Sequence, residues 1–250
     1  MKLAVLMAAY NAAPYVGDAL ASLLQQRTAA KLQIIVVNDG STDGTGDIVR
    51  AISAQAPEVN LVETANRGIS AARNRALDEV SPDTELISML DADDLSPAGR
   101  FARDIKHFTD DSQLGFHYGT TRMFRDISDD RLTPDTSTGK YVDLRGVQLG
   151  ASLMRKSLAD AVGRFDESFV QAEDTDFFFR MFQLRPRIRV VDDVCCYYRR
   201  HDRNITLQQD VSDRFYRRVI FNHIKRQKSG GAPVPDGFFD FRPFNSVDWL

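Results

Sequence analysis

Residues 86–97 read LISMLDADDLSP, a short apolar run that ends in three aspartates. Leu86–Leu90 is short, apolar and bounded by polar residues, which predicts a buried strand of a parallel sheet. Asp91 and Asp93 lie two residues apart, so an extended backbone would present both carboxylates on one side. Two such groups repel each other unless a cation or a proton settles their charge. The stretch therefore predicts a charged site at the end of a strand.

A helix start follows these aspartates directly. Ser96 and Pro97 predict an N-cap and then proline at the first helical position. Strand, acidic turn and helix in this order place the turn at the carboxyl edge of a sheet, where open α/β folds bind ligands. A solvated acidic loop is the alternative. We favour the functional interpretation because other parts of the chain indicate the same chemistry.

Strands and helices alternate over the first 110 residues. We predict strands at Leu3–Ala8, Leu32–Val37, Val59–Val62 and Leu86–Leu90. Helices follow at Pro14–Gln26, in a segment ending at Ala54, at Gly68–Glu79 and at Pro97–Phe108. Four such alternations predict an α/β fold with a doubly wound, mostly parallel central sheet flanked by helices.

The pattern changes after residue 110. We predict one or two strands in Gly115–Phe124, a mobile loop at Asp126–Lys140 and an apolar stretch at Gly150–Arg155. Helices are predicted at Ser157–Val162, Glu173–Gln183 and Ser212–Lys228. Two further strands, Ile188–Val191 and Val194–Tyr198, are predicted around an Asp192-Asp193 turn. Residues 229–237 have the composition of a linker, and residues 238–250 form an aromatic tail. We divide the chain into one domain, residues 1–205, with halves 1–110 and 111–205, and a C-terminal extension, residues 206–250.

Composition narrows the function classes. The 250 residues are 43% hydrophobic and 27% charged, with a net charge of −3, which argues against general nucleic-acid binding. Cys195 and Cys196 are adjacent, too close for an ordinary disulfide, and free thiols suit a reducing cytoplasm. No stretch reads as a signal peptide or membrane span. We expect a cytoplasmic protein, attached at most to the inner face of a membrane.

Glycine-rich phosphate loops are not the basis of this site. Gly44 and Gly46 begin a dinucleotide fingerprint, but Val49 stands where its third glycine or alanine belongs. Neither a Walker sequence nor a GxSxG elbow is present.

Polar residues follow the other predicted strands at the same edge. Tyr10, after the first strand, offers a ring on which a base could stack. Asp39, after the second, could accept a hydrogen bond from a nucleobase or ribose. The alternative, of equal weight, is that Asp39 or Asp43 caps the next helix.

Three arginines lie in or before the third helix: Arg67, Arg73 and Arg75. One of them near the site could hydrogen-bond a base or neutralise phosphate, while the others are better read as surface charges.

The predicted helix Glu173–Gln183 carries an unexpected carboxylate. Asp174 shares its stripe with Phe177, Phe178 and Met181, whereas a second, polar stripe holds Glu173, Asp176 and Arg180. An acid on the inward stripe is either an N-terminal charge that complements the helix dipole or a general base above the sheet edge. His201, among arginines, is by itself more often structural than a metal ligand.

Together these residues resemble the family-2 inverting glycosyltransferases, which have the nucleotide-sugar-binding GT-A fold. The resemblance covers about residues 1–205 and rests on six ordered pieces: AAYNAAPYV, IIVVNDGSTDGT, NRGISAARNRAL, LDADD, VGRFDESFVQAEDTDFFFRM and YRRH. The QxxRW motif of processive members is absent, which favours transfer of a single sugar.

The resemblance implies a role for each matching residue. Nucleotide-sugar contacts would come from Ala8, Tyr10, Asp39, Arg67, Asp91 and Ala92. Asp93 would ligate a divalent metal, Mn²⁺ or Mg²⁺, His201 would complete the metal site, and Asp174 would be the catalytic base. Asp94 extends the acidic motif, and its share in metal binding is open.

The implied activity is inverting transfer of one hexose from a nucleoside-diphosphate sugar, UDP-sugar by preference, to a hydroxyl of a glycan or lipid-linked glycan in polysaccharide biosynthesis. Two rival functions remain, a sugar nucleotidyltransferase and a catalytically silent nucleotide-sugar-binding module.

The C-terminal extension offers two further interactions. Arg214–Lys228 is amphipathic and basic, so it could lie on anionic lipid, although ordinary packing is an equal alternative. The aromatic tail could fold back or dock on a second subunit as a homodimer.

Overall fold

The computed structural model describes residues 1–145, 148–207, 209–235 and 238. Its first part alternates strands and helices: β1 (Lys2–Ala9), α1 (Val16–Leu24), β2 (Lys31–Asp39), α2 (Thr45–Ser53), β3 (Val59–Thr64), α3 (Ile69–Asp78), β4 (Leu86–Met89) and α4 (Arg100–Asp110). The second part contains β5 (Leu114–Phe124), η1 (Thr136–Thr138), β6 (Tyr141–Leu144), η2 (Leu149–Ala151), β7 (Ser152–Arg155), α5 (Lys156–Val162), α6 (Glu173–Gln183), β8 (Arg187–Arg199), η3 (Ile205–Leu207) and α7 (Gln209–Lys228).

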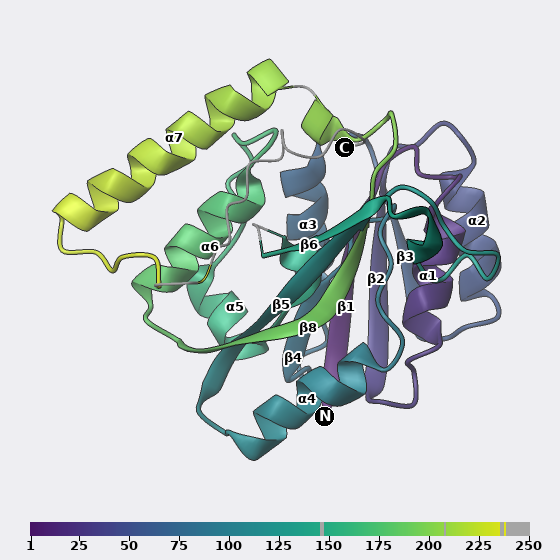
Figure 1. Ribbon diagram of the computed structural model, residues 1–250, viewed down its shortest axis with the longest axis horizontal. Coiled ribbons are helices and arrows are strands. Elements are labelled where there is room, and N and C mark those ends of the chain that lie inside the picture. Colours follow the sequence, from purple (N-terminus) through teal and green to yellow (C-terminus); the bar gives the residue numbers. More distant parts are fainter. Residues whose placement is uncertain (146–147, 208, 236–237, 239–250) are drawn as a thin grey trace.

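All eight strands join one sheet, with helices on both faces (Figure 1). The order is β3-β2-β1-β4-β7-β5-β6, and β8 pairs with β5. Pairs among β3, β2, β1 and β4 are parallel, as predicted, whereas β7 is antiparallel to both β4 and β5. The predicted α/β class is confirmed. The polar turns after β1, β2 and β4 therefore lie at one edge.

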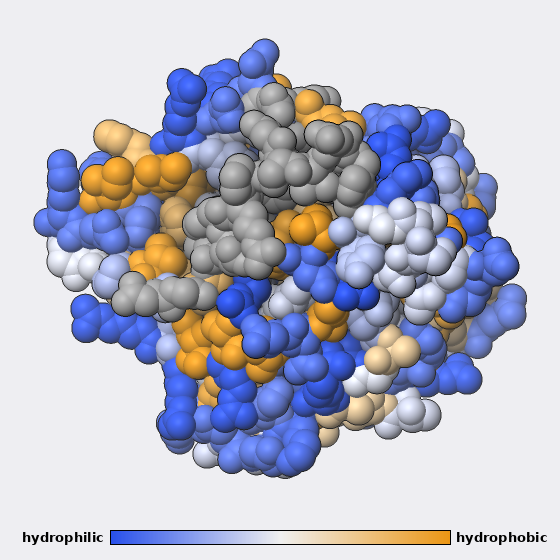
Figure 2. Space-filling view, in the orientation of Figure 1, coloured by the Kyte–Doolittle hydropathy of each residue, from blue (hydrophilic) through white to orange (hydrophobic). Residues whose placement is uncertain are grey.

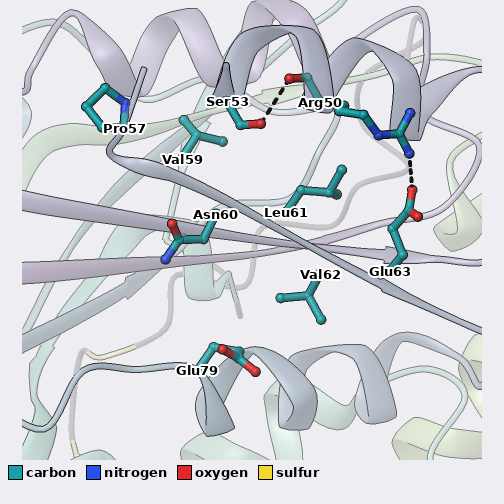
Figure 3. A pocket seen from close by; sticks show the side chains of 9 residues that line it. All are labelled: Arg50, Ser53, Pro57, Val59, Asn60, Leu61, Val62, Glu63 and Glu79. Carbon is teal, nitrogen blue, oxygen red and sulfur yellow. Dashed lines mark hydrogen bonds and ion pairs between the residues drawn. The ribbon is translucent and has the colours of Figure 1, made fainter. Parts of the chain in front are cut away.

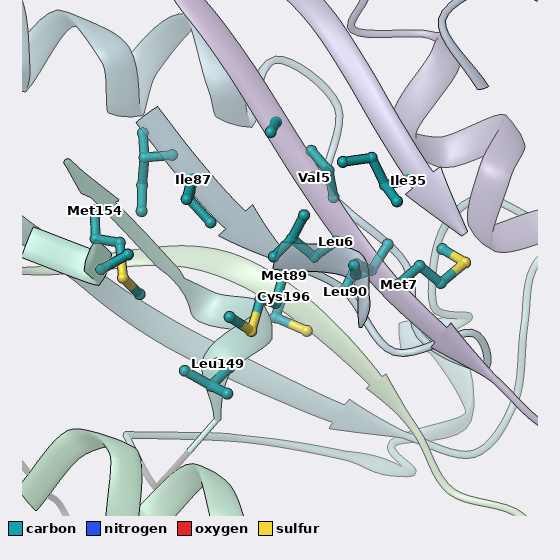
Figure 4. Close-up of a cluster of buried hydrophobic side chains, with 14 of the residues drawn as sticks. Val5, Leu6, Met7, Ile35, Ile87, Met89, Leu90, Leu149, Met154 and Cys196 are labelled. Atoms are coloured by element: carbon teal, nitrogen blue, oxygen red, sulfur yellow. The ribbon is translucent and has the colours of Figure 1, made fainter. Parts of the chain in front are cut away.

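The core lies where the central strands are buried on both faces. Strand β2 contributes the continuous run Ile34–Val37, all of it inaccessible to solvent, as parallel sheets require. Its side chains and those of β1 and β4 pack with residues from η2, β7 and β8 (Figure 4). This packing ties the two halves of the chain into one core.

Strand β8 corrects the prediction of two strands around a turn. The strand is continuous, and its register against β5 shifts between the pairs Tyr118–Val190 and Thr120–Val194. Asp192 and Asp193 therefore lie in an irregularity of the strand, where the local ladder is interrupted. An irregularity and a turn share the same exposed polar residues, so the sequence alone does not separate them.

The start of α4 is also later than predicted. Ser96 does not cap a helix, because it is buried, its hydroxyl accepts a bond from Gln26 and its N–H donates to Ser22. The adjacent Leu95 forms a bridge with Tyr197, so the regular helix begins at Arg100.

Two other predicted segments have mixed outcomes. Residues 126–140 contain a bridge between Ile127 and Pro134 and the short helix η1, while their mobility stays a prediction. The predicted aromatic tail lies outside the described residues except for Phe238, which stacks on Tyr118 at 4.7 Å between ring centroids. None of the described helices has the length and apolar composition needed to cross a bilayer.

A buried polar cluster lies beneath α4. The ligand atoms of Asp104, His117 and Cys195 come within 4.8 Å of one another, a spacing that a metal ion could use. However, Arg100 donates to Asp104 over 3.0 Å, and Arg103 lies 3.7 Å from the same carboxylate. These arginines already balance its charge, which disfavours a divalent cation.

His117 in this cluster is held neutral. It is inaccessible to solvent, and neither ring nitrogen has a hydrogen-bond partner in the part of the chain that the structure describes. Burial lowers the pKa of His117 to about 4, below the value of about 6.5 for an unfolded chain.

We predict that this histidine makes the fold acid-sensitive. Between about pH 6.5 and 4, His117 binds a proton in the unfolded state but not in the folded state. Its stabilisation of the folded state is therefore present above about pH 6.5 and is lost as the pH falls towards 4. Urea unfolding at about pH 7.5 and pH 5.0 should show wild type losing about 2 kcal/mol more than His117→Gln. The carboxylates titrate in both proteins, so equal losses would refute this role for His117.

Candidate active site

The turns after β1 and β2 are joined by hydrogen bonds. Asn11, at a φ of +49°, donates its N–H to Ser41 and accepts from the Thr42 N–H through its side chain, both at 2.9 Å. The neighbouring Tyr10 is 55% exposed. These contacts fix a wall at the carboxyl edge of the sheet and leave a free aromatic face for a planar ligand.

Asp39 lies behind this wall and holds the loop that leads into α3. Its two carboxylate oxygens accept from the N–H groups of Arg67 and Gly68 at 2.9 and 2.8 Å. Asp43 accepts from the Thr45 N–H at 3.1 Å and so caps α2. The predicted capping of the next helix is thus observed for Asp43 and not for Asp39, whose two bonds go to residues before α3. An ionised carboxylate has about four acceptor positions, so Asp39 keeps capacity for a ligand.

Arg73 connects the acidic turn after β4 to the start of α6. Its guanidinium is 5% exposed, donates to Asp91 over 2.8 Å and also pairs with Glu173. Arg73, rather than Arg67, is therefore the arginine at the centre of the edge. The Arg67 side chain is 71% exposed and pairs with Glu167, and Arg75 pairs with Glu79 on the surface.

Asp93 and His201 meet although 108 residues separate them. The Nε2 atom of His201 lies 3.0 Å from a carboxylate oxygen of Asp93. The imidazole stacks on Tyr15 with 4.3 Å between ring centroids. A hollow of about 420 Å³ adjoins this pair and is lined by Pro14, Tyr15, Arg125, Asp126, Arg200, His201, Asp202 and Arg203.

Asp94 points away from this opening. Its carboxylate is inaccessible to solvent and accepts from the Arg199 N–H at 3.0 Å and from Gln148 at 3.2 Å. Burial and the nearby Asp93 and Asp91 raise the pKa of Asp94 well above its usual range. Asp94 therefore joins the β4 turn to the end of β8 and is not available to a ligand.

Asp174 is half-buried at the first turn of α6. One of its oxygens accepts from the Thr175 N–H at 2.6 Å. Burial raises its pKa, and Asp91 adds to this, whereas Arg73 opposes it. The residue before the helix, Ala172, has a φ of +61°, a conformation that costs energy for a side chain with a Cβ. The entry to α6 is thus strained where it presents its carboxylates.

The polar stripe of α6 is buried, which the sequence pattern did not indicate. Glu173 lies against Arg73, and Asp176 accepts from Arg180 at 2.8 Å and from Arg226 of α7 at 2.9 Å. The packing of α3 on one side and α7 on the other covers these acids. The sequence pattern marks them only as polar, because it does not show that Arg73 and Arg226 reach them from other helices.

The structure gathers most of the predicted residues at this edge. Asp91 contacts the α6 start through Arg73, and Asp93 contacts His201 directly. Ala8 is half-buried at the end of β1, and Ala92 is buried between the two aspartates. Arg73 was not singled out in the sequence.

A larger hollow, of about 710 Å³, follows the edge strand β3 (Figure 3). Its walls include the Arg50–Glu63 ion pair, 2.7 Å long. None of the predicted site residues lines it.

Comparison with known proteins identifies the family. The protein-family model described as "Glycosyl transferase family 2" matches residues 4–204. The chain belongs to this family. Succinoglycan biosynthesis protein ExoU of Rhizobium meliloti is 30% identical over 215 residues, which cover 75% of this chain and 58% of that protein. The uncharacterized glycosyltransferase EpsJ of Bacillus subtilis is 25% identical over 217 residues, covering 81% and 62%. This family 2 chain thus spans about three fifths of these relatives.

Solved structures share the GT-A fold of this family 2 chain. Staphylococcus aureus TarS 1–349 in complex with UDP-GlcNAc has a TM-score of 0.70 at 21% identity and covers 94% of this chain and 68% of its own. The Pyrobaculum calidifontis mannosyltransferase PcManGT, in complex with GDP-Man and Mn²⁺, has a TM-score of 0.64 at 23% identity, with 92% and 65% covered.

We predict that Arg73 holds the site together. Arg73→Met leaves the Glu173 carboxylate buried without its cation and should lower the free energy of unfolding by about 3–5 kcal/mol. Arg75→Met removes an exposed pair on the same helix and should cost about 0.5 kcal/mol or less. Denaturant unfolding measures both.

A double variant tests the cause. Arg73→Met with Glu173→Leu removes both charges and should recover part of the loss. Strictly additive losses would mean that Arg73 acts through packing alone.

Proposed function

We propose that this chain is a metal-dependent, inverting hexosyltransferase. It moves one sugar from a nucleoside-diphosphate sugar, a UDP-sugar by preference, to a hydroxyl of a glycan or lipid-linked glycan. The observation that carries this proposal is the convergence of Asp91, Asp93–His201 and Asp174 on one sheet edge around Arg73. The nearby buried thiols of Cys195 and Cys196 fit a cytoplasmic location.

The nucleotide would bind where the strand-end turns meet. Tyr10 offers its exposed ring to the base, and Asp39 offers its remaining acceptor capacity. Ala8, near the carboxyl end of β1, and Arg67, just before α3, would flank this position. Asp91 and Ala92 follow on the side of the ribose.

The residues at the acidic turn fit a hard divalent cation. Asp93 and His201 supply an oxygen and a nitrogen from partly exposed side chains 3.0 Å apart. The carboxylate suits both Mn²⁺ and Mg²⁺, and the imidazole nitrogen favours Mn²⁺, because Mg²⁺ prefers oxygen ligands. Asp94 takes no part, since β8 holds its carboxylate. A bound cation would neutralise charge on the diphosphate and so improve it as a leaving group.

Asp174 would act as general base. As the acceptor oxygen attacks the anomeric carbon, Asp174 takes the hydroxyl proton and the new carbon–oxygen bond forms. The bond from that carbon to the diphosphate oxygen breaks on the opposite face, and the nucleoside diphosphate leaves with the electron pair. This single displacement inverts the anomeric configuration. Burial raises the pKa of Asp174 and makes it a stronger base, while Arg73 helps to keep it ionised.

The rival functions differ in their products. A sugar nucleotidyltransferase would release pyrophosphate from a nucleoside triphosphate and a sugar phosphate. A silent binding module would bind donors without releasing nucleoside diphosphate. A screen of UDP-, GDP- and dTDP-sugars with and without Mn²⁺ is scored by thermal shift and by nucleoside diphosphate release. It separates the three functions and identifies the nucleobase of the donor.

We predict that Asp174→Asn separates binding from turnover. The amide keeps the shape of the side chain but accepts no proton, so kcat should fall by about 10²–10⁴-fold. Donor affinity, measured by calorimetry, should change little. Asp160→Asn, an exposed acid on α5, is the control and should keep full activity. Near-normal turnover by Asp174→Asn would disprove the assignment of the base.

We predict the opposite pattern for Asp93→Ala. Loss of this carboxylate should weaken donor binding by about tenfold or more in Mn²⁺ and change it little in a chelator. Titration of the donor under both conditions measures the difference. Asp192→Ala removes a 97% exposed carboxylate and serves as the control. Equal affinities of Asp93→Ala and wild type in Mn²⁺ would exclude Asp93 as a ligand.

A further inference from the structure

Helix α7 exposes apolar side chains along its outer side. Ile220, Phe221 and Ile224 are 50%, 67% and 44% exposed. Their positions, one, three and four residues apart, keep them on one broad side of the helix. Figure 2 shows hydrophobic surface among hydrophilic side chains in the region of α7, at the left of the view.

The opposite side of α7 holds the helix on the protein. Val219 is inaccessible to solvent, and His223 is 7% exposed. Arg226 donates to the buried Asp176 of α6 over 2.9 Å. These contacts fix the orientation of α7, so its exposed apolar residues face away from the core.

Basic residues accompany the exposed apolar ones. Helix α7 contains six arginines and lysines and two aspartates, although the whole chain has a net charge of −3. Arg214, Arg217, Lys225 and Lys228 are exposed, and none forms an ion pair within the part of the chain that the structure describes. We call these four residues with Ile220, Phe221 and Ile224 the outer face of α7.

We propose that the outer face of α7 docks on an anionic lipid bilayer. An apolar stripe bordered by Lys and Arg can insert its apolar side chains about 5–10 Å into the headgroup boundary while the cations meet anionic headgroups. A second copy of this chain fits the charge less well. A twofold contact would bring the basic outer faces of both copies together, with like charges in repulsion.

The docking helix lies beside the site. Tyr216 on α7 hydrogen-bonds Thr175, the residue after Asp174. Gln171, just before α6, donates to the carbonyl of Ile205 over 3.1 Å and also bonds Ser212 of α7. A bilayer on the outer face would therefore be separated from the start of α6 by the thickness of α7, about 10 Å. Given the proposed function, this position suits an acceptor carried by a lipid.

Vesicle binding by the full chain tests the docking. Wild type should sediment with phosphatidylcholine vesicles that contain phosphatidylglycerol at low salt, and less at high salt, where charges are screened. Arg217→Glu with Lys225→Glu should lower the partition coefficient about thirtyfold or more. Ile220→Ser with Phe221→Ser should lower it as well. Arg27→Glu with Lys31→Glu makes the same charge change at exposed positions after α1 and at the start of β2 and should bind like wild type.

Three results would overturn the proposal. The first is that wild type does not bind anionic vesicles. The second is that both outer-face variants bind these vesicles as strongly as wild type. The third is that light scattering shows a dimer that the variants dissociate, while no lipid binding is seen. Donor hydrolysis in lipid-free solution should stay at the wild-type rate in all variants. Its absence in wild type would count against the proposed function and leave the docking result intact.

Discussion

The structure depends on one buried cation. The Arg73 guanidinium lies between the turn after β4 and the first turn of α6, where Asp91, Glu173 and Asp174 come together. Carboxylates so close would repel one another in a partly dry site without it. By pairing with both turns, Arg73 fixes the distance between the region that would hold a donor and the helix that would supply the base. The strained Ala172 at the entry to α6 is tolerated because this pairing over-determines its position.

Much of the fold follows from local sequence, because central parallel strands are apolar without alternation. Ile34–Val37 and Leu86–Leu90 show this directly, and the structure places both in the core. The start of α4 and the irregularity in β8 could not be predicted, since distant partners decide them. Ser96 is used by Gln26 and Ser22, and Asp192–Asp193 read equally well as a turn.

Some site residues could likewise be predicted from local sequence, whereas others depend on distant partners. The position of Asp91 and Asp93 after a strand is a local property and was predictable, whereas the approach of His201 to Asp93 followed only from the family resemblance. Arg73 could not be chosen over Arg67 and Arg75. Helix α3 buries mostly small residues, such as Ser70, Ala71 and Ala72, so no apolar stripe marks which of its arginines points inward. The family match supports the class of enzyme, and individual residue roles remain proposals.

The bond between Asp94 and the Arg199 amide has a consequence for biosynthesis. This bond sets the separation of Asp93 and His201 through the backbone, because Asp93 directly precedes Asp94 and His201 lies two residues after Arg199. The pair can form only after β8 has added to the sheet beside β5. A nascent chain that has not yet released residue 201 from the ribosome therefore has the turns after β1, β2 and β4 but not the Asp93–His201 pair.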